Sequence, residues 1–160
     1  MMDLNYIQTP LRNQTIEEQI KDFYLLNNKE RTYQHVLGVA MAAEKLALQY
    51  QEDIRACILA ALLHDISAVI TPQDMMKIAN ELQWQLDSAE KIYPFLLHQK
   101  ISALIAYEYF QIRDLSILKA IESHTTLRSN PSKLDMIIFI ADKLAWDQSG
   151  EPPFKKNIEM

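Results

Sequence analysis

The sequence predicts an all-α fold in a single domain, and three observations support this prediction. Only two glycines, Gly38 and Gly150, occur in 160 residues. Apolar residues recur at steps of three and four, which is the period of amphipathic helices and not the alternation of strands. A chain of this length is long enough for one domain with a full core and too short to argue for two. We therefore expect residues 1–160 to form one helical domain.

Seven helices are expected in order along the chain. They cover residues about 15–27, 30–50, 52–66, 72–83 and 96–110, a segment from Asp114 to near His124, and a last segment after Ser132. Start signals precede several of them. These signals are a capping box of Thr15 with Glu18, Thr71 before Pro72, and the N-cap residues Asp114 and Ser132.

Two of these helices place chemically active side chains on their inner faces. In the second helix, His35 lies on the same stripe as the apolar Val39, so we expect its imidazole to point inward. In the third helix, His64 lies on the same stripe as Cys57, while the helical period turns Asp65 away by roughly 100°. We expect both His64 and Asp65 near the C-terminal end of that helix.

Six side chains in these segments are competent to bind metal ions. They are His35, His64, Asp65, His98, His124 and Asp142, and they include every histidine of the chain. Neutral imidazole is the commonest metal ligand in proteins, and a bridging carboxylate allows two cations to lie close together. An aspartate in an apolar helix is costly to bury unless it is paired, hydrogen-bonded or bound to metal. This set of residues therefore suits a two-metal hydrolytic centre.

Five short motifs, in a fixed order, resemble those of a known family. They are His35, the LLHD of Leu62 to Asp65, the LLH ending at His98, the HT of His124-Thr125, and the IAD ending at Asp142. Through these motifs the chain resembles the HD-domain metal-dependent phosphohydrolases, and it is most similar to the bacterial HD-domain symmetrical diadenosine-tetraphosphate hydrolases. The likeness covers most of the chain. It implies a single HD-domain helical bundle over residues 1–160, with a metal-binding core at about 31–146.

The resemblance also implies how two metal ions share the six side chains, with Asp65 as the bridging catalytic ligand. One ion would be held by His35, His64, Asp65 and Asp142, and the other by Asp65, His98 and His124. No thiolate takes part, and a nitrogen and oxygen donor set with more than four positions per ion suits manganese, cobalt, nickel or iron at least as well as zinc. The family favours iron among these divalent or trivalent ions, and it suggests a homodimer.

Two arginines are candidates for contacts with substrate phosphates. Arg31 lies one turn before His35, and Arg128 lies just beyond His124-Thr125. Arginine suits this task because its guanidinium donates charge-assisted hydrogen bonds to phosphate oxygens. We therefore expect both side chains to assist catalysis by the metal centre.

The chain departs from the resembling hydrolases at two basic positions. Those hydrolases have a lysine soon after the His-Asp pair, whereas this chain continues with Ile66-Ser67-Ala68-Val69. They also follow the last aspartate with an acidic-proline-arginine segment, whereas this chain has Asp142-Lys143-Leu144-Ala145-Trp146. The expected metal ligands are intact, while the groups expected to meet a polyphosphate are altered.

Composition excludes several other classes of protein. The net charge is -5 and no block of basic residues occurs, so we expect no nucleic-acid partner. No apolar run approaches the roughly 18 residues that a membrane helix needs, so we expect no membrane partner and a cytoplasmic location. Cys57 is the single cysteine, which excludes an internal disulfide and suggests a small core residue.

Several functions remain open from the sequence. The first is hydrolysis of a small-molecule nucleotide, with symmetrical cleavage of diadenosine tetraphosphate to ADP by metal-activated water as the leading case. The alternatives are another HD-type nucleoside-phosphate or phosphate-ester hydrolase, a non-catalytic metal- and nucleotide-binding protein, and a metal-free structural role. Five aromatic residues are expected to pack in the core or at its rim, with base stacking as the alternative: Tyr93, Phe95, Tyr107, Tyr109 and Phe110.

Overall fold

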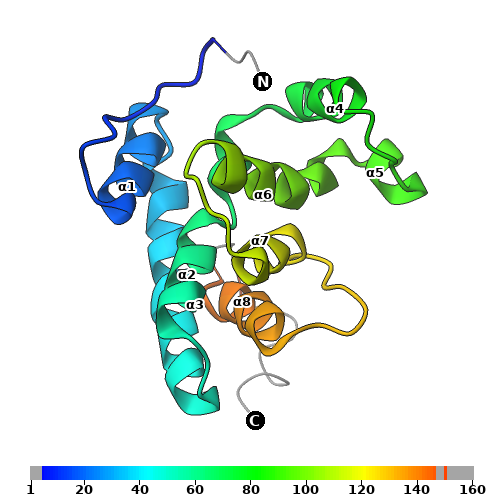
Figure 1. The fold of residues 1–160 in the computed structure, drawn as a ribbon. Coiled ribbons are helices and arrows are strands. Elements are labelled where there is room, and N and C mark those ends of the chain that lie inside the picture. Colours follow the sequence, from blue (N-terminus) through cyan, green and yellow to red (C-terminus); the bar gives the residue numbers. More distant parts are fainter. Residues whose placement is uncertain (1–4, 147–149, 151–160) are drawn as a thin grey trace.

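All regular elements in the described part of the chain, residues 5–146 and 150, are helices (Figure 1). The predicted all-α class is therefore confirmed. The α-helices are α1 (Ile16–Leu26), α2 (Glu30–Tyr50), α3 (Ile54–Leu63), α4 (Pro72–Glu81), α5 (Ser88–Ile92), α6 (His98–Glu108), α7 (Leu115–Glu122) and α8 (Lys133–Leu144). Two 3-10 helices join them, η1 (Ile66–Val69) and η2 (Pro94–Leu97).

The predicted start signals act as helix caps in the structure. The Thr15 side chain accepts a hydrogen bond from the backbone N–H of Glu18, and the Glu18 carboxylate accepts one from Thr15 in return. Each such cap satisfies N–H groups that have no partner within the helix. The short helix α5 has the same kind of capping box, formed by Asp87 and Glu90, but it was not predicted. Its five residues are too few for the apolar period to stand out.

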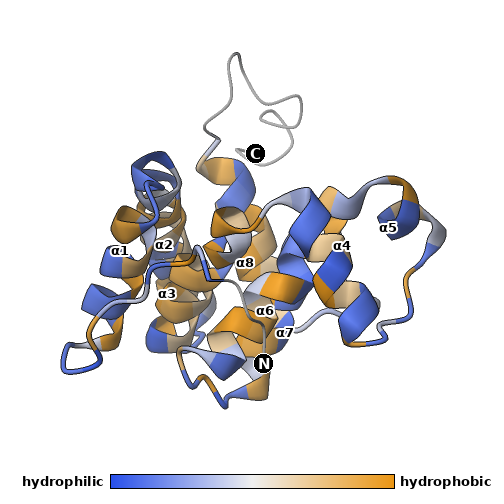
Figure 2. Ribbon diagram, turned by 90° about the horizontal axis from the view of Figure 1, so that it is seen from above, coloured by the Kyte–Doolittle hydropathy of each residue, from blue (hydrophilic) through white to orange (hydrophobic). Residues whose placement is uncertain are grey.

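Helix α3 forms the centre of the bundle. It contacts α1, α2, α6, α7 and α8. Seven of its ten residues are buried, including Cys57. Figure 2 shows that α3 is hydrophobic around most of its visible surface, in contrast to the two-sided α4. A helix that is apolar all round is stable only when other helices cover it, so the composition of α3 accounts for its central place.

The end of α3 differs from the prediction. The helix ends at Leu63, His64 is its C-cap residue, and Asp65 lies outside it, before η1. The expected rotation of roughly 100° between the two side chains therefore does not apply, because the backbone has left the α-helical path at Asp65. As a result His64 and Asp65 reach the same cluster of side chains.

Helices α2 and α8 pack closely beside each other. Gly38 of α2 lies opposite Ala145, where a Cβ atom on the glycine would be 3.6 Å from the Ala145 Cβ. Small residues at this crossing allow the two backbones to approach. His35 lies about one turn before Gly38 and Asp142 about one turn before Ala145, so the crossing brings these two side chains together.

No single helix in the described part of the chain is both long and apolar enough to span a membrane. The segments Ile54–Val69 and Pro72–Glu81 meet that test only as a pair, and they are bent by 101° relative to each other.

Candidate metal centre

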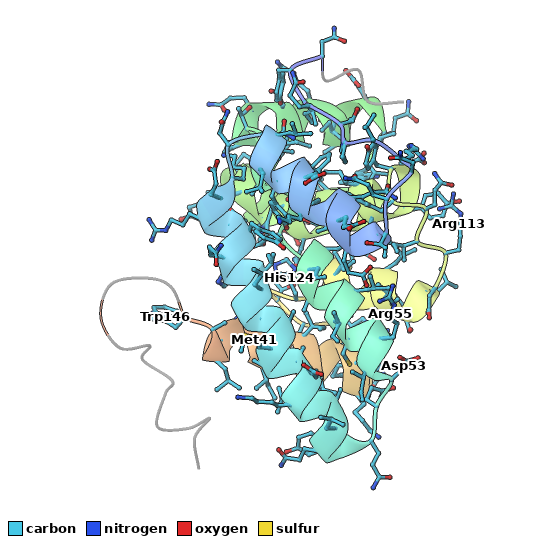
Figure 3. The ribbon with its side chains drawn as sticks, turned by 90° about the vertical axis from the view of Figure 1, so that its left-hand side faces the viewer. Met41, Asp53, Arg55, Arg113, His124 and Trp146 are labelled. Carbon is cyan, nitrogen blue, oxygen red and sulfur yellow. The ribbon has the colours of Figure 1, made fainter. Side chains whose placement is uncertain are left out.

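The six predicted metal ligands converge on one place in the structure. His35 comes from α2 and Asp142 from α8, and His98 is the first residue of α6. His64 and Asp65 directly follow α3, and His124 follows α7. Figure 3 shows His124 in the interior of the molecule. A cavity of about 660 Å³ is lined by five of the six, and His64 is fully buried beside them. The fold therefore assembles residues that are up to 107 positions apart in the sequence.

The carboxylate of Asp65 lies between two groups of histidines. Its Oδ2 atom is 3.4 Å from His64 Nε2 and 3.9 Å from His35 Nε2. Its Oδ1 atom is 3.4 Å from His124 Nε2 and 3.9 Å from His98 Nε2. Each oxygen thus faces a different pair of imidazoles, which is the arrangement that a bridging carboxylate requires.

Asp142 belongs to one of these two groups. Its Oδ1 atom is 3.1 Å from His35 Nε2 and 3.5 Å from His64 Nε2. Ligand atoms of His35, His64 and Asp142 lie within 4.8 Å of one another, and so do those of His64, Asp65 and His124. Both sets are compact enough to surround a metal ion.

Backbone carbonyls orient three of the imidazoles. The Nδ1 atoms of His64, His98 and His124 lie 2.6 Å, 2.7 Å and 2.8 Å from the carbonyl oxygens three residues earlier in the chain. A carbonyl oxygen only accepts, so Nδ1 carries the proton and the lone pair of a neutral ring is at Nε2. This orientation is typical of histidines that bind metal through Nε2.

The Nε2 atoms of His98 and His124 are only 3.1 Å apart. Because both rings donate through Nδ1, two lone pairs face each other at this distance, and a cation between or beside them removes the repulsion. His64 Nε2 is buried and has no hydrogen-bond partner among the described residues, and it lies 3.4 Å from Asp65 Oδ2 and 3.5 Å from Asp142 Oδ1. The unpartnered His64 Nε2 atom and the facing Nε2 atoms of His98 and His124 fit a metal centre well.

The charges of the cluster also favour a cation. Burial alone would lower the pKa of His64, but the Asp65 and Asp142 carboxylates raise it to about 10. Burial, helped by His124, lowers the pKa of His98 to about 4. Burial alone would raise the pKa of Asp65 and of Asp142, yet the neighbouring histidines hold both well below the usual range. The cluster therefore contains two ionised carboxylates, and one of them, Asp65, faces a neutral imidazole at His98.

Outer contacts support His98 and the segment after Asp65. Thr125 Oγ1 lies 3.0 Å from His98 Nε2. The Ser67 hydroxyl donates to the backbone carbonyl of His98 at 2.8 Å, and Ser102 Oγ accepts from the Ser67 backbone N–H at 3.1 Å. Ser67 and Ser102 are fully buried. Contacts of this kind hold ligands in position, and sequence reasoning missed them because the partners lie 31 and 35 residues apart.

The two candidate arginines lie in different places. Arg31 lines the cavity, as predicted from its position before His35. Arg128 does not line it; its Nε atom donates to Asp135 Oδ2 at 2.7 Å. Asp135 is buried and accepts from the Ser132 backbone N–H, so Arg128 supports the cap of α8. The structure therefore does not bring Arg128 to the expected phosphate site.

Lys143 is a cation of the cavity wall that sequence reasoning passed over. Its ammonium donates to Asp142 Oδ2 at 2.9 Å and lies 4.6 Å from the centre of the Phe139 ring. The other oxygen of Asp142 faces His35 and His64. Lys143 thus contacts the oxygen of Asp142 that does not face the histidines. Its position directly after the last expected ligand could have indicated this role from the sequence.

Residues 32–147 match the family model of the HD domain. The chain belongs to this family, which confirms the resemblance found in the motifs. The match is close to the expected core of residues 31–146.

Several curated relatives carry functional names. A protein of Halalkalibacterium halodurans named symmetrical bis(5'-nucleosyl)-tetraphosphatase is 38% identical over 114 residues, which are 71% of this chain and 60% of that one. A Mycoplasma genitalium protein named probable nicotinate-nucleotide adenylyltransferase/Ap4A hydrolase is 32% identical over 116 residues, or 72% of this chain and 32% of that one. The chain thus spans from about a third to three fifths of the length of these relatives.

A solved structure has the same fold. It is a protein of Clostridium acetobutylicum described as a "predicted HD superfamily hydrolase involved in NAD metabolism". The TM-score is 0.80 at 31% identity, and the match covers 89% of this chain and 77% of that one.

Proposed function

We propose that this chain is a metal-dependent phosphohydrolase that acts on a nucleotide, with symmetrical hydrolysis of diadenosine tetraphosphate to ADP as the leading reaction. The observation that carries the proposal is the shared Asp65 carboxylate, whose two oxygens face two different pairs of histidines. The relative named symmetrical bis(5'-nucleosyl)-tetraphosphatase supports the choice of substrate.

Two metal ions fit the donor atoms. One would be held by His35, His64, Asp65 and Asp142, and the other by Asp65, His98 and His124. When bound, such a pair lowers the pKa of a water molecule and takes up negative charge on phosphate. All donors are nitrogen or oxygen, which suits iron, our first choice, and also manganese, cobalt, nickel or zinc.

In the proposed reaction, the oxygen of one water molecule bonds to one of the two central phosphorus atoms. The bond from that phosphorus to the oxygen that bridges the two central phosphorus atoms breaks. This oxygen leaves with the other half of the molecule. One dinucleotide and one water therefore give two ADP molecules. Arg31 and Lys143 line the cavity, where their charges would hold the polyphosphate.

Product analysis tests this assignment. The purified protein, after incubation with iron or manganese salts, is supplied with diadenosine tetraphosphate, and the products are separated. We expect ADP alone and more than one equivalent of metal per chain. AMP together with ATP would exclude symmetrical cleavage. Less than about a tenth of an equivalent of metal after incubation would exclude the dinuclear centre.

A second candidate is a metal- and nucleotide-binding protein without turnover. Ala68, which lines the cavity where the resembling hydrolases have a lysine, favours it. Ala68→Lys separates the two candidates, because one more charge-assisted contact in the transition state is worth about 10- to 100-fold. An enzyme should gain turnover in this range at unchanged metal content. A metal-loaded protein that hydrolyses no phosphate ester, before or after the substitution, fits the second candidate.

A further inference from the structure

The cavity over the metal cluster has two unlike walls. Helices α2 and α8 contribute its basic side chains, Arg31 and Lys143. The segment from η1 into α4, together with η2, contributes apolar side chains: Ala68, Ile70, Pro72, Met75 and Phe95. In the view of Figure 1, α4 lies above α6 and α8 lies below it, so these walls come from different parts of the bundle. We call the second set the apolar wall.

Phe95 is the most exposed large side chain of the apolar wall. It is 60% exposed, whereas Met75 is 3% and Ile70 is 4% exposed. Its neighbours Ile92 and Tyr93 are also exposed, but they do not line the cavity. Phe95 thus leaves apolar area open to solvent within the cavity, and a ligand that covered this area would gain the free energy of burying it.

The ring of Phe95 is stacked on the ring of His98. Their centroids are 4.5 Å apart and the planes differ by 16°. The carbonyl oxygen of Phe95 also accepts the hydrogen bond from His98 Nδ1 at 2.7 Å. The same residue therefore supports a metal ligand and presents an aromatic surface directly beside the metal centre.

We propose that the apolar wall, with Phe95 as its stacking platform, binds the nucleobase of the ligand while the metal centre, Arg31 and Lys143 bind its phosphates. This inference rests on the proposed function and adds the subsite for the base. A bare phosphate chain would leave the apolar wall without a partner. A nucleotide has one flat, weakly polar end and one anionic end, which matches a cavity divided in this way.

Ala68 fits the same division of the cavity. It is half-buried on the apolar wall, three residues after Asp65, where the resembling hydrolases have a lysine. Alanine keeps this position of the wall apolar, next to Ser67, which also lines the cavity. The cations of the cavity are then concentrated on α2 and α8, so the ligand has one favoured direction, with its base toward Phe95 and its phosphates toward Lys143.

Two ligands distinguish the base subsite from the phosphate site. Isothermal titration of the metal-loaded protein is carried out with ADP and with inorganic pyrophosphate, for the wild type, Phe95→Leu and Phe95→Trp. Stacking of one base on an aromatic ring corresponds to about 5- to 100-fold in affinity. Phe95→Leu should lower the affinity for ADP by this factor and change the affinity for pyrophosphate by no more than about twofold. Phe95→Trp should restore the affinity for ADP.

Tyr93→Leu is the matched control, since Tyr93 is 64% exposed on the same segment but lies outside the cavity lining. It should change neither affinity. Equal weakening of both ligands in Phe95→Leu, with loss of metal, would mean that the ring acts only through His98 and would overturn the inference. So would an unchanged affinity for ADP. Binding of neither ligand by the metal-loaded wild type would overturn the proposed phosphohydrolase as well.

Discussion

The two halves of the metal centre are built from similar ligands but carry different charges. In the half formed by α2, α3 and α8, His35 and His64 lie 3.1 Å and 3.5 Å from the same oxygen of Asp142. In the half formed by α6 and α7, His98 and His124 face each other at 3.1 Å, and their nearest anion is Asp65. In the first half, Asp142 supplies negative charge in addition to Asp65, whereas Asp65 is the anion nearest to the second half.

This difference has a consequence for the affinities of the two halves. A carboxylate attracts a cation more strongly than a neutral imidazole does, and the attraction is larger when the pair is removed from water. The high pKa of His64, about 10 against the burial that would lower it, reflects the two carboxylates beside it. The low pKa of His98, about 4, follows from burial and from the neighbouring His124. We therefore expect the first half to bind its ion more tightly.

Loss of Asp65 should have the largest effect, because it removes the anion that both halves use. We expect Asp65→Ala to bind less than about a tenth of an equivalent of metal. Its loss of activity should exceed the roughly 10- to 100-fold loss that follows removal of a residue hydrogen-bonded to a metal ligand. Elemental analysis and turnover of diadenosine tetraphosphate measure both. Asp114→Asn, at an exposed helix cap outside the cavity, is the control. Two bound metals in Asp65→Ala would refute the shared ligand.

Substitutions in only one half should test the difference directly. His98→Ala removes a ligand of the α6–α7 half and should leave about one tightly bound ion per chain. Asp142→Asn removes an anion from the other half while the side chain keeps nearly the same size, and it should abolish tight binding of the metal ion there. Titration with a competing chelator, followed by metal analysis, separates the two affinities. If His98→Ala lost the tighter ion, the proposed order of affinities would be reversed.

The smallest effects are expected from two cations at different distances from the centre. Lys143→Met should lower the affinity for pyrophosphate by about 10-fold, since one charge-assisted contact is lost, while both metals stay bound. Arg128→Met should leave that affinity unchanged and lower the free energy of unfolding by about 1–2 kcal/mol, a value reduced for its partial exposure. Calorimetry and urea unfolding measure the two. Weaker binding of pyrophosphate by Arg128→Met would mean that Arg128 contributes to the phosphate site after all.

Much of the helical structure could be predicted from the sequence, because its signals are local. The start of α1 at the Thr15 cap and the start of α8 at the Ser132 cap agree with the prediction. The end of α3 does not, since no residue near Leu63 signals a stop. That end depends on the packing of η1 against α6, where Ser67 and Ser102 are hydrogen-bonded to each other.

The candidate site divides in the same way. All six expected ligands meet in the structure. The sequence pointed to them through the order of the five motifs and their likeness to those of the HD-domain hydrolases. The structure does not bring Arg128 to the cavity, since an arginine four residues after a histidine can turn toward any nearby anion. Asp135, which it contacts, belongs to the capping box of the next helix, and this choice between partners is made by tertiary packing.

The sequence by itself determined the all-α class and most helix starts, because these follow from period and capping. It also pointed to six candidate metal ligands, through their side-chain chemistry and the order of the five motifs that resemble those of the HD-domain hydrolases. Only the tertiary structure decided which oxygen of Asp65 faces which histidines, that Lys143 holds Asp142 from behind, and that Phe95 lies on His98. The physical reason is that these are contacts between side-chain atoms a few ångströms apart. Such distances depend on how the helices cross, and no local pattern records the crossing.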